Sequence, residues 1–358
     1  MSDTKSRDSA VSSEAILEAR FGEYGESIDR SSSLLLNNEK DQEGMIIPAE
    51  ATWIKIVDEK GLSIEGKFYV PQGEKNNEII IINPGLPGDG IAKFEEAYVA
   101  EMVSRGYTVF CSRHNGLRVT EDAADKYTHC PEKKQWAKDK KQEKIGGQFS
   151  FQEWGREVLT AIKGLEAKFE KLHFVGHSAG SLNILNSLGH LSRELPHLKE
   201  KIGSFVSMAG VVGEYDKKLM AKILSWVTEI GVLGSIDEDD NLRELAECED
   251  FLRTIDWSQF PNMSSMFITP AEVFPSTLGD GSSVHKPDEY VDPASVKHFT
   301  DFMREQGCDR VRTINYGNMT KAIKPGHESH DFDHLSPGIV MRSITGENDS
   351  RLQNNIDT

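Results

Sequence analysis

The chain has 358 residues, 37% of them hydrophobic and 28% charged, an ordinary balance for a soluble protein that carries some polar tail. Its formal net charge of -17 disfavours nucleic-acid phosphates and anionic lipid surfaces as partners, whereas small neutral or apolar ligands are easier to accommodate. No apolar run approaches about 18 residues and no apolar signal core follows the first methionine, so we expect neither a transmembrane segment nor secretion by the usual route.

Four cysteines are widely spaced and form no C-x-x-C pair: Cys111, Cys130, Cys248 and Cys308. Disulfide frameworks and zinc sites need cysteines that are paired or closely spaced. We therefore expect reduced thiols in a cytoplasmic protein.

The first 45 residues are rich in Ser, Glu, Asp, Asn and Arg, and their apolar residues are confined to short patches such as 15–17 and 34–36. Such a segment buries too little apolar surface to offset the entropy of ordering it, which predicts a disordered polar tail over 1–45. The two patches are candidates for docking onto the body or onto a partner. Residues 46–350 are predicted to form one domain.

The first elements of that domain are predicted strands. Trp53–Val57 and Leu62–Val70 flank a turn at Asp58–Gly61, which is typical of a hairpin. Glu78–Asn83 contains four consecutive isoleucines, which indicates a strand covered on both faces.

A glycine-rich loop over 83–90 follows, and then apolar residues at helical spacing predict a helix that ends at Gly106. Tyr107–Cys111 is predicted to be another buried strand. Residues 115–147 have no clear period and contain six lysines between 133 and 144. Because nucleic-acid binding would require aromatic residues and glycines among these lysines, we interpret the segment as an exposed loop or short helix.

Strands and helices alternate in the next part of the chain. Ser150 and Glu153 form a capping box, with Phe149 and Trp154 placed for a hydrophobic staple, so a helix is predicted to begin there. A strand over 171–175, a helix from Gly180 and a strand over 203–209 follow. This alternation predicts a mainly parallel sheet covered by helices on both faces.

Residues 212–262 interrupt the alternation with two amphipathic helical patterns, one over 219–230 and one over 242–252. We expect a helical cap at about 212–262 that keeps water from an apolar pocket; a packing element without a gating role is the alternative. The remaining predicted elements are a strand over 265–269, a helix from Asp292-Pro293 to Gly307, a strand over 310–316 and a helix from Ser336-Pro337.

Ser178 lies in Gly176-His177-Ser178-Ala179-Gly180, which fits G-x-S-x-G between a predicted strand and a predicted helix. A strand that turns directly into a helix strains its turning residue, and glycines beside it leave room. The helix amino terminus directs free amides and a positive dipole at the same point, so charge forming on a bound carbonyl oxygen would be stabilised there. These are the requirements of a nucleophilic serine.

From about Ala51 to Ile344 the chain resembles the α/β-hydrolase superfamily, in its serine esterase/lipase or serine aminopeptidase-like branch. The resemblance rests on the serine turn, the loop Pro84-Gly85-Leu86-Pro87-Gly88, the order of strands and helices, and the late histidines. It implies an α/β-hydrolase fold with a helical lid insertion. It also implies an oxyanion hole made by the backbone N–H groups of Leu86 and Ala179.

The resemblance further implies the chain order serine, acid, histidine. The expected position of the acid falls at or beside Val273, which cannot serve, so we favour the adjacent Glu272 over Asp280. For the base we favour His334, with His327 and His330 as alternates, whereas His177 is interpreted as a packing residue of the turn. A zinc site formed by His327, His330, Asp333 and His334 is the disfavoured alternative, because their spacing is not a regular helical pair.

The implied activity is that of a serine hydrolase of the esterase or lipase type, which cleaves a small acyl ester or thioester through an acyl-enzyme and requires no cofactor or metal. A peptidase or an acyltransferase on the same fold, and a binding module that has lost activity, remain alternatives. No nucleic-acid partner is expected. The sequence does not indicate the oligomeric state, the acyl chain length or the leaving group.

Overall fold

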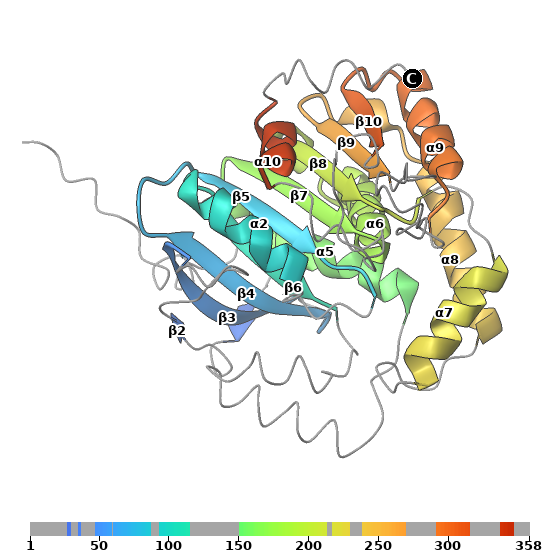
Figure 1. Ribbon diagram of the computed structural model, residues 1–358, viewed down its shortest axis with the longest axis horizontal. Helices are drawn as coiled ribbons and strands as arrows, with labels where there is room; N and C mark the ends of the chain where they lie inside the picture. The colour runs from blue at the N-terminus through green and yellow to red at the C-terminus, as the bar shows by residue number, and fades with distance from the viewer. Residues whose placement is uncertain are drawn as a thin grey trace, which may run out of the picture.

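One sheet lies at the centre of the computed structural model (Figure 1). The structure describes residues 27–29, 35–36, 47–58, 60–86, 93–114, 150–212, 217–229, 238–269, 291–315 and 337–346. Within this part of the chain the strands are β1 (Ser27–Asp29), β2 (Leu35–Leu36), β3 (Ala49–Val57), β4 (Ser63–Pro71), β5 (Glu78–Asn83), β6 (Thr108–Arg113), β7 (Lys171–His177), β8 (Ile202–Met208), β9 (Ser264–Thr269) and β10 (Val311–Asn315).

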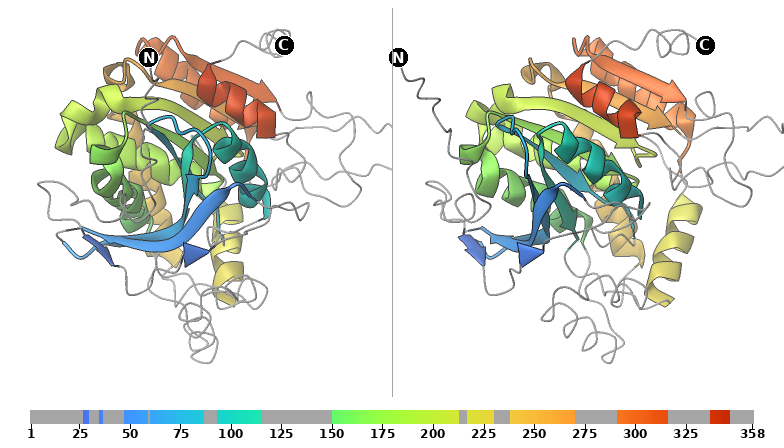
Figure 2. Two further views of the ribbon diagram at one scale, coloured as in Figure 1. Left: turned by 90° about the vertical axis from the view of Figure 1, so that its left-hand side faces the viewer. Right: turned by 60° about the vertical axis from the view of Figure 1, so that its left-hand side comes forward.

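The strands lie in the order β1-β3-β4-β6-β5-β7-β8-β9-β10, with β2 also paired to β3. The pairs β1-β3, β2-β3, β3-β4 and β4-β6 are antiparallel. The pairs β6-β5, β5-β7, β7-β8, β8-β9 and β9-β10 are parallel. The blue strands at one edge and the orange strands at the other lie on opposite sides of the molecule (Figure 2). The predicted class, a mainly parallel sheet with helices on both faces, is confirmed.

The described helices are α2 (Lys93–Ser104), α5 (Phe151–Leu165), α6 (Ala179–Glu194), α7 (Lys217–Glu229), α8 (Glu238–Arg253), α9 (Pro293–Glu305) and α10 (Pro337–Thr345), with short 3-10 helices at Glu166–Lys168, Pro196–Lys201 and Trp257–Gln259. Helices α2 and α10 contact each other on one face of the sheet, and α5, α6 and α8 contact one another on the opposite face (Figure 1). Right-handed crossovers between parallel strands require this division.

The central strands are buried on both faces, as the isoleucines of β5 predict. Each side chain from Ile79 to Ile82 is at most 2% exposed. The helix starts and stops also follow the sequence: Gly106 and Gly307 have φ of +85° and +91°, and the Asp292 carboxylate accepts a hydrogen bond from the Ala294 N–H at 3.0 Å. These local signals therefore set the ends of α2 and α9.

Two short segments of the predicted polar tail belong to the sheet. Strand β1 pairs with Lys55–Val57, and β2 pairs with Ala51 and Thr52. Without them the outer edge of β3 would present unpaired N–H and C=O groups, which attract further strands. The other residues of the predicted tail lie outside the described part of the chain, so its disorder stays a prediction; 35–36 falls in one of the two apolar patches that were candidates for docking.

The predicted helical pair within 212–262 is present as α7 and α8, which contact each other. Helix α8 packs on α5 and α6, and its Leu245 and Leu252 side chains are at most 1% exposed. The Glu244 carboxylate also accepts the Phe151 N–H at 2.9 Å, at the start of α5. This helix is therefore a packed part of the described body, and the expected gating role stays a prediction.

The three cysteines in the described part of the chain, Cys111, Cys248 and Cys308, form no disulfide bond. Burial is the main cause that raises the pKa of Cys248 to about 12 and that of Cys308 to about 11, and thiols with raised pKa are poorly reactive. Cys130 lies outside the described residues.

None of the helices in the described ranges has both the length and the apolarity needed to cross a membrane.

Candidate active site

Ser178 occupies the turn between β7 and α6 in a strained conformation, with φ 50° and ψ -123°. Strain of this kind costs on the order of 1–3 kcal/mol and persists only where the surroundings hold it. The Ser178 N–H donates to the Met208 carbonyl at 2.9 Å, and the Ser178 carbonyl accepts from the N–H groups of Ser181 at 3.1 Å and Val211 at 3.2 Å. These three bonds hold the turn between β8 and α6, at the carboxyl end of β7.

Close backbone approach explains the glycines around this turn. A Cβ on Gly180 would lie 2.1 Å from the Asn83 carbonyl oxygen, so α6 can begin against the end of β5 only if this residue is glycine. A Cβ on Gly85 would lie 2.7 Å from the Ser178 Cβ. The loop after β5 and the serine turn are therefore in direct contact.

The two residues predicted to donate to the oxyanion are the chain neighbours of the two residues in this contact. Ala179 is the first residue of α6, and Leu86, which is half-buried, follows Gly85. Because the first amides of a helix have no partner within it, the start of α6 offers N–H groups and a positive dipole beside the serine hydroxyl. The loop and the serine turn lie together, and the oxyanion role of the two amides stays a prediction.

The interpretation of His177 as a packing residue agrees with its surroundings. Its side chain is 6% exposed, and a Cβ on Gly85 would lie 3.0 Å from its Nδ1 atom. Its ring therefore packs against Gly85, in the loop that contacts the serine.

Sequence reasoning missed a buried cluster behind that loop. His114, directly after β6, lies with its Nε2 2.7 Å from the Pro84 carbonyl oxygen and its Nδ1 3.3 Å from the Glu157 Oε2 atom. The ring stacks on Trp154 with centroids 3.9 Å apart and planes 7° apart. The available signal was a charged residue, Glu157, within the apolar face of the helix that contains Trp154 and Val158.

The predicted base and acid lie outside the described residues. Glu272 and Asp280 fall in 270–290, after β9, and His327, His330 and His334 fall in 316–336, after β10. Since β7 to β10 are parallel, the described strands β9 and β10 end on the same side of the sheet as β7, which Ser178 follows. The roles of these residues stay predictions.

The disfavoured zinc alternative, with His327, His330, Asp333 and His334, also falls outside the described residues. Within the described ranges, His, Cys, Asp and Glu side chains form no group of three or more that could hold a metal ion.

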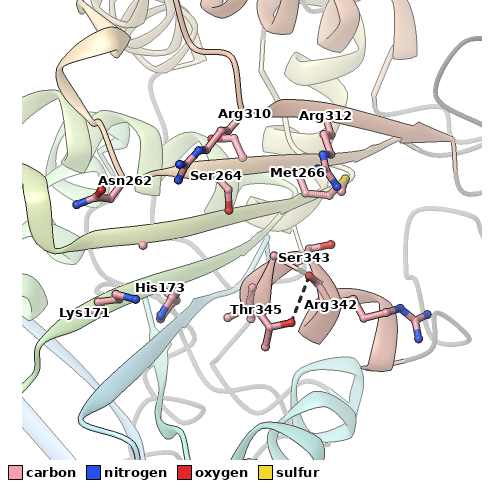
Figure 3. A pocket seen from close by; sticks show the side chains of 14 residues that line it. Lys171, His173, Asn262, Ser264, Met266, Arg310, Arg312, Arg342, Ser343 and Thr345 are labelled. Carbon is pink, nitrogen blue, oxygen red and sulfur yellow. Dashed lines mark hydrogen bonds between the residues drawn. The ribbon is translucent and has the colours of Figure 1, made fainter. Parts of the chain in front are cut away.

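A cavity of about 530 Å³ lies at the amino-terminal ends of the parallel strands, on the side of the sheet opposite to Ser178 (Figure 3). Lys171 and His173 line it at the start of β7, and Arg310 and Arg312 line it at the start of β10. Glu78 offsets part of this positive charge: His173 lies 3.0 Å and Lys171 3.5 Å from its carboxylate oxygens, and the hydrogen bond to His173 is the main cause that lowers the pKa of Glu78. The cavity is separate from the serine turn, because Ser178 follows the other end of β7.

Comparison with known proteins gives no match to a family model and none to a curated protein sequence. Solved structures with a similar chain path include the Pyrococcus furiosus esterase Pf2001, at 11% identity and a TM-score of 0.49, over 87% of this chain and 95% of that one. Est1E from Butyrivibrio proteoclasticus has 12% identity and a TM-score of 0.46, over 83% and 96% of the two chains. The peroxisomal alpha-beta-hydrolase Lpx1 from Saccharomyces cerevisiae has 10% identity and a TM-score of 0.43, over 90% of this chain and 88% of that one. Similarity at this level concerns the fold, so the chemistry must be argued from the residues of this chain.

Proposed function

We propose that this chain, which has the α/β-hydrolase fold, is a serine hydrolase that cleaves a carboxylic ester or thioester through an acyl-enzyme. The observation that carries the proposal is the backbone of Ser178, held at φ 50° against the Gly85 loop. Strained residues concentrate at functional sites. The strained turn puts Ser178 at the end of buried strand β7, beside the amino terminus of α6, a helix of 16 residues.

The proposed reaction has two halves. The Ser178 hydroxyl attacks the substrate carbonyl while a histidine takes its proton, and the N–H groups of Leu86 and Ala179 stabilise the negative oxygen that forms. The tetrahedral adduct collapses, and the histidine gives its proton to the leaving alcohol or thiol. Water, deprotonated by the same histidine, then attacks the acyl-enzyme, and the histidine returns that proton to the Ser178 oxygen as the acyl C–O bond breaks and the acid leaves.

We propose His334 as the base and Glu272 as the acid that orients it, with His330, His327 and Asp280 as alternates. The acid candidates follow β9 and the histidines follow β10, and both strands end on the side of the sheet where Ser178 follows β7, which supports a role for both. No cofactor or metal enters this scheme. The proposed substrate is a small acyl ester. We also propose that residues 212–262 form a cap over the site and that the protein is cytoplasmic.

A fluorophosphonate probe tests the nucleophile, because it forms a covalent bond only with an activated serine. Labelling should occur in the wild type and disappear in Ser178→Ala. Ser192→Ala is the matched control: Ser192 lies on the same helix, where its hydroxyl donates to the Gly189 carbonyl at 2.8 Å. An unlabelled but folded wild type would favour the binding module instead.

Alanine substitution of the late histidines tests the base. His334→Ala should abolish turnover with the fold intact, whereas His298→Ala, which removes an exposed histidine of α9, should not change it. Normal turnover of the His334 variant would move the role to His327 or His330.

Substrate panels distinguish the remaining activities. We expect turnover of p-nitrophenyl esters of graded chain length and none of aminoacyl-naphthylamides, the substrates of a peptidase. Transfer of the acyl group to an added alcohol in preference to water would instead indicate an acyltransferase.

A further inference from the structure

The His114 cluster is buried directly behind the loop that contacts the serine. The His114 side chain is 1% exposed, and Glu157 and Trp154 are 0% and 1% exposed. Three elements meet here, because Pro84 follows β5, His114 follows β6 and Glu157 lies on α5. The hydrogen bonds of His114, which directly follows β6, therefore join the loop to α5.

The chemistry of the contacts defines one proton position. A carbonyl oxygen only accepts, so the 2.7 Å contact with Pro84 requires a hydrogen on Nε2 of His114. At 3.3 Å, Nδ1 and the Glu157 carboxyl share one proton, which resides on one of the two atoms. In either arrangement Nε2 donates to Pro84, and Glu157 holds the ring with that nitrogen facing the loop.

This bond acts on the peptide group that leads into the loop. The unit that joins Pro84 to Gly85 is planar, so fixing the direction of the Pro84 carbonyl also fixes the direction of the Gly85 N–H. The same carbonyl oxygen would lie 2.5 Å from a Cβ on Gly180, so it is held between His114 and the start of α6. The path of the chain from Pro84 to Leu86 is thereby fixed relative to Ser178.

We propose that His114 is a positioning residue that holds the loop Pro84–Leu86 in the geometry needed to stabilise the oxyanion, with Glu157 and Trp154 fixing its ring. The inference rests on the proposed serine hydrolase function. An apolar core of the same shape would give similar stability without burying an imidazole and a carboxyl group. The polar cluster therefore has its main consequence in orientation rather than in stability.

Three substitutions separate these roles. His114→Gln can place an amide N–H near the former Nε2 atom, His114→Asn reaches only the region of Nδ1, and His114→Leu fills the space without a donor. We expect kcat for p-nitrophenyl acetate and the rate of fluorophosphonate labelling to fall about 10–100-fold in the Leu and Asn variants. The Gln variant should keep most of the rate. KM should change less than about threefold in all three, because loop orientation affects the transition state more than the bound ester.

The comparison requires folded protein, so urea unfolding is measured on each variant and rates are compared at a temperature where all are folded. A purely structural role predicts that rates follow stability and that Gln rescues no better than Leu, and this result would overturn the proposal.

Hydrogen exchange of the Gly85 and Leu86 amides, followed by NMR, separates this inference from the proposed function. These amides should exchange faster in the Leu variant than in wild type and Gln. If the wild-type serine fails to label, the proposed function fails, but faster exchange in the Leu variant still supports the role of His114. Unchanged exchange would refute that role whatever the activity.

Discussion

Replacement of Gly85 by alanine tests the contact between the loop and the serine. The new methyl carbon would lie 2.7 Å from the Ser178 Cβ, whereas carbon atoms normally approach to about 3.5–4.0 Å, so the loop must retreat by about 1 Å. A displacement of about that size in a catalytic site costs roughly 100-fold in rate, which corresponds to about 2.7 kcal/mol of transition-state stabilisation. Overpacking should destabilise the fold by about 1–3 kcal/mol, and the lower entropy of the unfolded chain offsets about 0.4–1 kcal/mol of that loss.

The assay is the second-order rate of fluorophosphonate labelling, with urea unfolding measured on the same samples. Gly73→Ala is the matched control, because it is also a loop glycine and a Cβ there has no heavy atom within 4 Å beyond its chain neighbours. We expect the Gly73 variant to label at the wild-type rate and the Gly85 variant about 100-fold more slowly. Equal rates in two folded variants would refute the reasoning that this loop sets the oxyanion geometry.

Three further predictions concern stability and its pH dependence. Ser178→Gly should be about 1 kcal/mol more stable than Ser178→Ala in urea unfolding, because only glycine adopts a positive φ without strain; equal midpoints would contradict strain at this turn. Glu244→Ala should cost about 1 kcal/mol, since it removes the acceptor of the Phe151 N–H at the start of α5, and an unchanged midpoint would argue against this cap. Burial first, and then the charge of Arg156, lower the pKa of His190 from 6.5 to about 4, so between these values the unfolded chain binds more protons than the folded one. The stability contribution is therefore present above pH 6.5 and is lost as the pH falls towards 4; His190→Gln should make the fall in urea midpoint shallower over this range, and an identical pH profile would exclude the effect.

Local sequence patterns predicted much of the sheet and the nucleophile. Four isoleucines predict a strand buried on both faces, Gly106 and Gly307 mark helix ends, and the glycines around Ser178 indicate a strand that turns directly into a helix. Each of these features depends on contacts or backbone angles within a few residues. They can therefore be inferred without knowing which distant segments are neighbours.

Other features depend on residues far apart in the chain. Short strands within the polar tail pair with β3, because an open sheet edge attracts any segment that can supply hydrogen bonds. Glu244 caps α5 across 93 positions, and His114 reaches Pro84 across 30 and Glu157 across 43. Local hydrophobic periodicity cannot predict which of these distant residues form hydrogen bonds with each other.

The sequence by itself determined which side chain is raised at the end of a buried strand, because strain and glycine spacing are local properties. Only the tertiary structure decided that a buried histidine, His114, contacts the loop after β5 from the side of β6 and α5. The physical reason is that the orientation of a peptide group is set by whichever donors and acceptors the fold brings to it.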